Sequence, residues 1–471
     1  MKVMKLALLG TAALAAVSVS ARADDLADLK SQIEALNSRI SQLEAAPAVP
    51  AGYQLLSVSE APAVVVPTIS SDVGYGANAT TIGILPTADV PASTTIQWSG
   101  YARAGLVHAS GKFSETVTRS LVTVSGAPNG TSTLGGSVSD KDTDIYARAQ
   151  LKVVGTTDTA VGEVGAWIEF RANLHGIGGN TDLFINDNAF GWWKMTPELT
   201  LIGGYTDTLA NIGYGYDGAC NCYYTDNAPV ALNPGDTTQL RLAYASGPIS
   251  FAVALEDGDQ DYGNGDAVAF VSDSLGVAGK IKYSGDTFSG EIGGGYWGKG
   301  KDSGVGIATG GLPPIVNTDT LAPDVTSAWQ VGAGLGFSFD PISLSLAAGV
   351  GQDHLGYDYW KASALASANL NDSVHAEVAY GYSDADGYIG RCMDAACTFA
   401  YTGDATAKTH AVLAGIYYDP VSQLTIGLEG EWYRTKVAGN DDNGALDLLA
   451  GDTYSAKSTN WQVDLVTVFR F

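Results

Sequence analysis

From Thr95 to the end of the chain, polar and apolar residues alternate along a series of short segments. A period of two places successive side chains on opposite faces of a β-strand, so the pattern predicts β-structure. One face is charged, and a packed core does not accept unpaired charges. The alternation therefore favours strands with lipid on one face and water on the other. In the first segment the apolar face contains Ile96, Trp98, Gly100, Ala102, Ala104 and Leu106, and the polar face contains Gln97, Ser99, Tyr101 and Arg103.

The connections between these segments alternate between short and long. Longer polar loops are predicted at 109–141, 207–236, 298–326, 383–407 and 436–458, among others. Seven short turns and eight longer connections make sixteen strands, and barrels of roughly 16–18 strands leave an aqueous channel. We therefore predict an all-β fold, a 16-stranded antiparallel transmembrane β-barrel over residues 95–471. The short turns are expected at Thr157-Asp158, Thr196-Pro197-Glu198, Ser246-Gly247-Pro248, Ser284-Gly285-Asp286, Asp340-Pro341, Asn371-Asp372 and Asp419-Pro420.

The final strand supports the same fold. It ends the chain on an aromatic residue, Phe471, which resembles the sorting signal that the barrel-assembly machinery of the outer membrane recognises. Aromatic residues recur near other strand ends, as girdles at the two membrane interfaces require. One face of the final strand contains Trp461, Val463, Leu465, Thr467, Phe469 and Phe471.

The N-terminus predicts export. Lys2 and Lys5 precede an apolar run from Leu6 to Val19, and Ala21-Arg22-Ala23 fits a small-x-small cleavage site. Residues 1–23 are therefore interpreted as a secretory signal peptide, with a mature start at Asp24. No later segment offers the ~18 consecutive apolar residues that a transmembrane helix needs.

Residues 24–46 carry a heptad pattern that predicts a short coiled-coil helix in the periplasm. A single amphipathic helix lying on the barrel fits the same spacing. Pro47 and Pro50 end the helix, and residues 47–94 form a linker rich in Pro, Ala and Val, in which stretches such as 55–58 can pair locally. The apolar heptad positions are Leu26, Leu29, Ile33, Leu36, Ile40 and Leu43.

The charge balance restricts the partners. The chain has 50 Asp and Glu against 25 Lys and Arg, so it lacks the basic face that nucleic acid requires. Carboxylates in the outer loops favour divalent cations that bridge to lipopolysaccharide. A mild preference for cations follows for any pore, weakened by salt. No cofactor is predicted.

Together these features resemble the general bacterial porins, and more closely the alphaproteobacterial porin family. The resemblance covers residues 96 to 471 and depends on Ile96-Gln97-Trp98-Ser99-Gly100-Tyr101, on the strand rhythm and on the terminal Val468-Phe469-Arg470-Phe471. It implies a homotrimer of outer-membrane pores for passive diffusion of ions and small hydrophilic solutes. It also implies that the loop after the fifth strand folds into the lumen as a constriction.

The corresponding loop here is Asp207 to Asp236. In the porins that the chain resembles, loop carboxylates face basic wall residues across the narrowest point. Such a pair would orient dipolar solutes, because charged rings set pore selectivity, although some of these charges can be merely solvated. The candidate loop carboxylates are Asp207, Asp217 and Asp226, and the candidate wall bases are Arg103, Arg148, Lys152, Arg171 and Arg241.

Four cysteines lie in two of the predicted loops, Cys220 and Cys222 in one and Cys392 and Cys397 in the other. An even count in an exported chain favours disulfides, with three possible connectivities. The spacings do not match the usual zinc sites, so no metal site is predicted. We expect the disulfides to rigidify the constriction.

Four alternatives compete with the pore. An enzyme is disfavoured because none of the five histidines lies in a catalytic motif. A structural envelope protein, tethering or trimerising through the coiled coil, is compatible with the same features. A substrate-specific channel for sugars would need lumen aromatics, for which Tyr101, Tyr146 and Trp167 are a small basis. A soluble β-sandwich or propeller does not account for the charged strand faces and the terminal Phe471.

Overall fold

The fold is seen in a computed structural model. It describes residues 56–69, 78–84, 94–122, 128–175, 185–218, 223, 228–258, 275–298, 326–354, 356–392, 400–440 and 453–471. The predicted signal peptide and coiled-coil helix lie outside the described residues, as do parts of the predicted linker. Among the described residues, no helix is long and apolar enough to cross a membrane.

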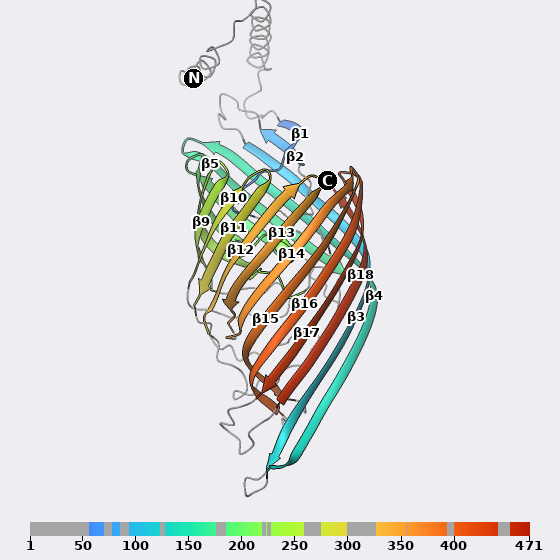
Figure 1. The fold of residues 1–471 in the computed structure, drawn as a ribbon. Coiled ribbons are helices and arrows are strands. Elements are labelled where there is room, and N and C mark those ends of the chain that lie inside the picture. The colour runs from blue at the N-terminus through green and yellow to red at the C-terminus, as the bar shows by residue number, and fades with distance from the viewer. Residues whose placement is uncertain are drawn as a thin grey trace, which may run out of the picture. The chain divides into compact units, whose positions relative to one another are not determined.

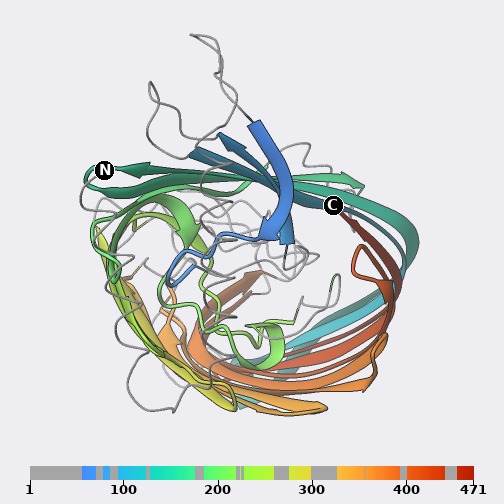
Figure 2. The same cartoon turned by 90° about the horizontal axis from the view of Figure 1, so that it is seen from above.

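The described chain forms a closed antiparallel barrel of sixteen strands, β3 to β18, as predicted. Each strand pairs with its neighbours in the sequence, and β18 pairs with β3 to close the ring (Figures 1 and 2). Two further strands, β1 and β2, join the sheet outside this ring. The strands are β1 Leu56–Pro62, β2 Asn78–Ile84, β3 Thr94–Val122, β4 Pro128–Thr159, β5 Gly162–His175, β6 Ile185–Lys194, β7 Leu199–Asp207, β8 Asp236–Ser246, β9 Ile249–Glu256, β10 Gly276–Ser284, β11 Phe288–Trp297, β12 Ala328–Phe339, β13 Ile342–Gln352, β14 Asp358–Asn371, β15 Val374–Cys392, β16 Ala400–Val421, β17 Leu424–Asn440 and β18 Thr453–Arg470.

The two faces of the barrel wall reverse the arrangement of a soluble protein. On β3, Trp98 and Leu106 are exposed, whereas Arg103 between them is buried. On β18, Val463 and Leu465 are exposed and Asp464 is fully buried. Apolar residues outside and polar residues inside are the pattern of a barrel in lipid. The predicted assignment of faces is therefore confirmed on both strands.

All seven short turns occur, at the end of the barrel where the C-terminus lies (Figure 1). Two are displaced from the predicted positions. Thr157 and Asp158 still pair within β4 and β5, so the turn is at 160–161. Asp419 and Pro420 belong to β16, where the pairing with β17 is irregular, and the turn is at 422–423.

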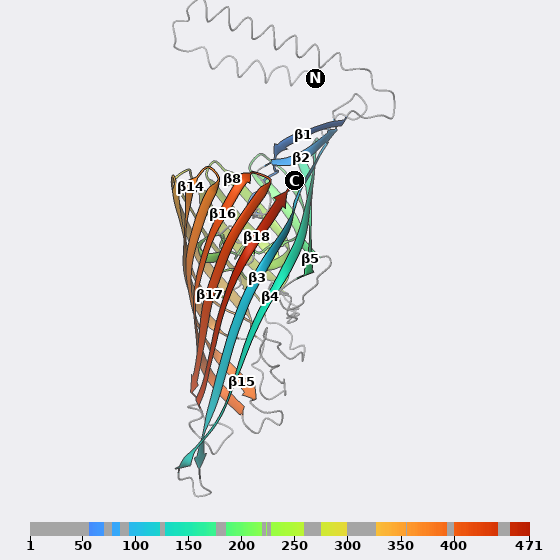
Figure 3. The same cartoon turned by 90° about the vertical axis from the view of Figure 1, so that its right-hand side faces the viewer.

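Two of the predicted loops prove to be largely strand, and a third is strand at both of its edges. Segment 109–141 is mostly a hairpin extension of β3 and β4, which pair continuously to Val122 and Pro128 (Figure 3). Much of 383–407 and the edges of 436–458 similarly extend β15 to β18. Polar, turn-forming residues predicted loops here, but tertiary pairing with neighbouring strands overrides such local preferences.

The hairpin of β1 and β2 continues the barrel wall at the short-turn end. Phe471 exchanges backbone hydrogen bonds with Gly100, at 3.2 and 3.1 Å. Just beyond, β2 pairs antiparallel with β3, with Thr80 opposite Trp98. Since β18 also runs antiparallel to β3, β2 extends the line of β18 past the end of the chain. Part of the predicted linker is thus integral to the sheet.

Candidate functional site

The described residues of the connection between β7 and β8, 207–218, 223 and 228–236, lie against the inner wall of the barrel. We call this connection the inner loop. Its short helix α3, Gly215–Gly218, lies against β13, β14 and β15 (Figure 2). The Gly215 N–H donates to Ser345 Oγ on β13 at 2.8 Å, and the Tyr216 N–H donates to Ser363 Oγ on β14 at 3.0 Å. The loop therefore occupies the lumen.

Wall carboxylates hold the backbone of the inner loop. Glu256 accepts hydrogen bonds from Thr208 Oγ1 at 2.7 Å and from the Leu209 N–H at 3.1 Å. Glu291 on β11 accepts one from the Gly213 N–H at 2.6 Å. Hydrogen bonds to charged groups are about twice as strong as neutral ones, so these contacts fix where the loop begins its path.

Two carboxylates of β17 hold the far part of the same loop. Glu431 accepts from the Tyr216 hydroxyl at 2.6 Å and from the Ala228 N–H at 3.2 Å. Glu429 accepts from the Tyr223 N–H at 2.8 Å. Both carboxylates are buried. The loop is thus anchored at both ends of its course along the wall.

Glycines in the wall leave room for the loop's apolar side chains. A Cβ added at Gly334 would lie 2.4 Å from the Tyr214 ring. One at Gly332 would lie 2.7 Å from Ile212, and one at Gly349 would lie 2.8 Å from Leu232. Since no real Cβ makes such contacts, side chains at these positions would displace the loop.

The predicted wall bases of β3 to β5 face the lumen. Arg103 and Lys152 are buried there, and Lys152 Nζ lies 3.5 Å from the centre of the Trp167 ring. Arg148 Nε donates to Asn173 Oδ1 at 2.5 Å. Arg171 forms an ion pair with Asp187 at 2.5 Å.

The inner loop approaches these bases through Tyr223. The Arg103 guanidinium lies 6.0 Å from the centre of the Tyr223 ring. Arg470 Nη2 donates to the Tyr223 hydroxyl at 2.5 Å. Burial raises the pKa of Tyr223, so its hydroxyl remains neutral near pH 7.

Of the predicted loop carboxylates, only Asp207 is described with its side chain. It ends β7 and accepts a hydrogen bond from Asn211 Nδ2 at 3.1 Å. Asp217 lies in α3 and Cys392 ends β15, with their backbones alone described. Asp226, Cys220, Cys222 and Cys397 lie outside the described residues, so the disulfides and the facing carboxylates stay predictions.

Arg241 of β8 is fully buried and does not face the lumen water. Its Nη2 donates to the Asp207 carbonyl at 2.5 Å. Its Nη1 donates to the Thr68 carbonyl at 2.8 Å and to Thr68 Oγ1 at 3.1 Å. Arg241 therefore joins the base of the inner loop to a segment that follows β1.

That segment, residues 63–69, is called the strap. It leaves β1 and turns inside the ring (Figure 2). Gln97 on β3 binds its start, donating to the Pro62 carbonyl at 2.9 Å and accepting from the Val64 N–H at 2.8 Å. The predicted linker did not include a segment that enters the barrel, because the residues that bind the strap, Gln97 and Arg241, are remote from it in the sequence.

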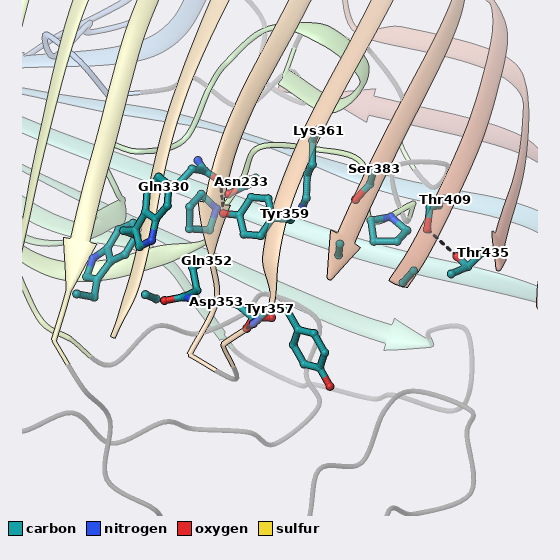
Figure 4. A pocket seen from close by; sticks show the side chains of 17 residues that line it. Asn233, Gln330, Gln352, Asp353, Tyr357, Tyr359, Lys361, Ser383, Thr409 and Thr435 are labelled. Carbon is teal, nitrogen blue, oxygen red and sulfur yellow. Dashed lines mark hydrogen bonds between the residues drawn. The ribbon is translucent and has the colours of Figure 1, made fainter. Parts of the chain in front are cut away.

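A cavity of about 410 Å³ lies beside the inner loop, toward the ends of β13 to β17 that carry the long connections (Figure 4). The Tyr359 hydroxyl donates to Gln330 Oε1 at 2.9 Å. Lys361 Nζ donates to the Ala231 carbonyl at 2.8 Å. Burial raises the pKa of Tyr357, in the connection before β14, to about 12. The lining combines aromatic rings with amides and hydroxyls.

The sequence analysis missed the wall residues that hold the loop. Inward positions of β9, β11 and β17 carry these residues, which the period of two could have selected: Glu256, Glu291, Glu429 and Glu431. Nothing in the sequence indicated what they bind. Among the described residues, no cluster of His, Cys, Asp and Glu is arranged to hold a metal ion.

The described residues form a porin-like fold, a closed sixteen-stranded barrel with an apolar exterior and a loop held against its inner wall. The chain matches no protein-family model and no curated protein. It is similar to a loop-deletion mutant of OmpT, an outer membrane protein of Vibrio cholerae, with 14% identity and a TM-score of 0.47, over 80% of this chain and 99% of that one.

Two other solved structures are similar over comparable lengths. The anion-selective porin from Comamonas acidovorans has 13% identity and a TM-score of 0.44, over 80% of this chain and 100% of that one. Salmonella typhi OmpF, in complex with daunomycin, has 14% identity and a TM-score of 0.45, over 78% and 97%. At such identities, these proteins say nothing of the solutes of this chain.

Proposed function

We propose that the protein is a water-filled channel for passive diffusion of ions and small hydrophilic solutes across the outer membrane. The observation that carries this proposal is the inner loop, held inside the barrel by wall carboxylates. A loop fixed in the lumen narrows the pore without closing it. Charged groups around the loop set the selectivity of the pore.

The candidate constriction combines the inner loop with the basic wall of β3 to β5. Arg103, Arg148, Lys152 and Arg171 would face solutes from one side, and Asp207, Asp217 and Asp226 would belong to the other. The formal net charge of −25 supports a mild preference for cations. The cysteines would rigidify the outer part of this loop.

The test is the conductance of single channels of purified protein in a planar bilayer with a salt gradient. Ohmic steps with a reversal potential that favours cations are expected. Steps in groups of three would support the homotrimer. Silence from a folded, heat-modifiable barrel would contradict the channel and favour a structural envelope protein, tethered by a periplasmic coiled coil.

A location in the outer membrane would give the protein two further partners. Lipopolysaccharide would bind the acidic outer loops through divalent cations, and the barrel-assembly machinery would recognise the final strand ending at Phe471. Removing divalent cations with a chelator should loosen the association with lipopolysaccharide. An unchanged association in chelator would contradict that bridge.

A second candidate function, a channel with a preference for saccharides, is favoured by the cavity in Figure 4. Tyrosine rings can stack on the apolar face of a sugar, while Asn233, Gln330 and Ser383 offer amides and a hydroxyl. Its volume of about 410 Å³ lies within the ~300–1,000 Å³ of small-molecule sites. Block of the ion current by maltotriose, but not by polyethylene glycol of the same mass, would support it. Equal block would contradict it.

A further inference from the structure

One sector of the inner wall is apolar. On β5 to β7 the inward positions carry Trp167, Phe190, Trp192 and Ile202, all buried. On β8 to β10 the corresponding inward positions carry Ala243, Ala252, Ala254 and Ala278, also buried. The inward face of a water-filled barrel is ordinarily polar. Large apolar side chains on that face indicate that something other than water covers them.

The strap supplies part of that cover. Val66 is 2% exposed and belongs to the same buried cluster as these wall residues. Val64 and Ile69 pack against the cluster from its edge. Val65, between them, is 86% exposed. The strap thus buries Val66 against the apolar wall, and the adjacent Val65 points away from that wall.

Polar contacts hold both ends of the strap. Gln97 binds the backbone at Pro62 and Val64, and Arg241 binds Thr68 twice. An arginine with several donors in fixed geometry suits such a position, because it can bind two backbone segments at once. Arg241 also donates to the Asp207 carbonyl, at the base of the inner loop.

We propose that the strap is a second narrowing element of the pore, entering from the short-turn end, and that Arg241 is the residue that positions it against the inner loop. The inference rests on the proposed channel function. The strap and the inner loop cover adjoining sectors of the wall and meet at Arg241. Solute size would therefore be limited by both elements, with the strap acting on the periplasmic side of the inner loop.

The test compares Val66→Gln with the matched control Val65→Gln, which places the same neutral amide on the exposed neighbour. Burying an unpartnered amide is costly, so Val66→Gln should release the strap. We expect its single-channel conductance to rise about twofold, because pore width sets conduction, and larger uncharged polymers should enter. Val65→Gln should conduct as the parent does. Equal conductance in the parent and both variants would overturn the proposal.

A second measurement separates this proposal from the channel itself and from misfolding. Val66→Cys and Val65→Cys, in protein that is folded by heat-modifiability, are treated with a membrane-impermeant maleimide and compared with the parent. Val65→Cys should react at least tenfold faster than Val66→Cys. Equal reaction would overturn the position of the strap, whatever the conductance. A parent that does not conduct, with Val66→Cys protected, would contradict the diffusion channel while keeping the strap as the covering element.

Discussion

The inner loop and the strap both lie inside the barrel, but the wall holds them by different means. The inner loop is held by wall carboxylates that accept hydrogen bonds from its backbone. It packs against a part of the wall where glycines leave room for its side chains. The strap is held by an apolar wall of aromatic and small side chains, by Gln97 at one end and by Arg241 at the other. The two segments meet in one apolar cluster, which contains both Val66 of the strap and Leu209 of the inner loop. The comparison shows that an inward position in this barrel is not simply a water-facing position.

Removing Arg241 should have the largest effect, since it contacts both elements. In Arg241→Ala the partly buried Thr68 and Asp207 carbonyls lose a charged donor, so the free energy of unfolding should fall on the order of 3 kcal/mol. Conductance should rise as well. Urea titration of the barrel in detergent and bilayer recordings measure the two effects. Arg241→Lys keeps the charge with fewer donors, so its stability should lie between those of the parent and Arg241→Ala. If Arg241→Ala is as stable as the parent, Arg241 does not hold the strap and the inner loop together.

Filling the glycine wall should affect the inner loop alone. In Gly334→Leu the new side chain would collide with the Tyr214 ring, at a cost of about 1–3 kcal/mol, and should displace the loop and widen the pore. Gly279→Leu is the control on the outer face of the wall, where Gly279 pairs with the exposed Val253 and its Cβ would meet nothing closer than 3.5 Å. Single-channel conductance should rise in the first variant and stay constant in the second. A rise in both would mean that the change in conductance does not come from displacing the inner loop.

Weakening a wall carboxylate should have a smaller effect. Glu431→Gln keeps an acceptor for the Tyr216 hydroxyl and the Ala228 N–H but loses the charge, at a cost of about 1 kcal/mol. The reversal potential should shift toward a weaker cation preference. Glu60→Gln removes one carboxylate at an exposed position of β1 and should leave the potential unchanged. Identical shifts in both variants would show that total charge, and not the lumen, sets the preference.

The smallest effect is expected from pH. Burial raises the pKa of Tyr357 from the ordinary value near 10 to about 12. Below pH 10 the phenol is neutral in both the folded and the unfolded chain; above it the unfolded chain ionises first, so stability falls between about pH 10 and 12. The unfolding temperature should therefore drop over this window, and Tyr357→Phe should drop less. A parallel decline in both proteins would exclude Tyr357 as a contributor.

Local pattern was sufficient to predict the wall of the barrel. The period of two assigned Trp98 and Leu106 to the outside and Arg103 to the inside, and the turn residues predicted sixteen strands. These features depend on neighbours along one strand, which the sequence displays directly. The extent of the hairpins was less predictable, because strand pairing at 109–141 depends on the partner strand and not on local preference.

The contents of the barrel were predictable only in part. The placement of the inner loop in the lumen was expected only from the resemblance to porins, whereas the lumen placement of Arg103 and Lys152 follows from alternation. Arg241 was expected to face solutes, yet it binds the loop base and the strap. Its partner Thr68 is 173 residues away in the chain, and no local pattern connects the two.

The sequence by itself determined which residues face lipid and which face the interior, because that choice repeats every two residues along each strand. Only the tertiary structure decided what the interior positions face: the inner loop at Glu431 and Gly334, and the strap at Gln97 and Arg241. The physical reason is that closure of the barrel brings remote segments together, and burial there is decided by shape and hydrogen bonding across the lumen and not along the chain.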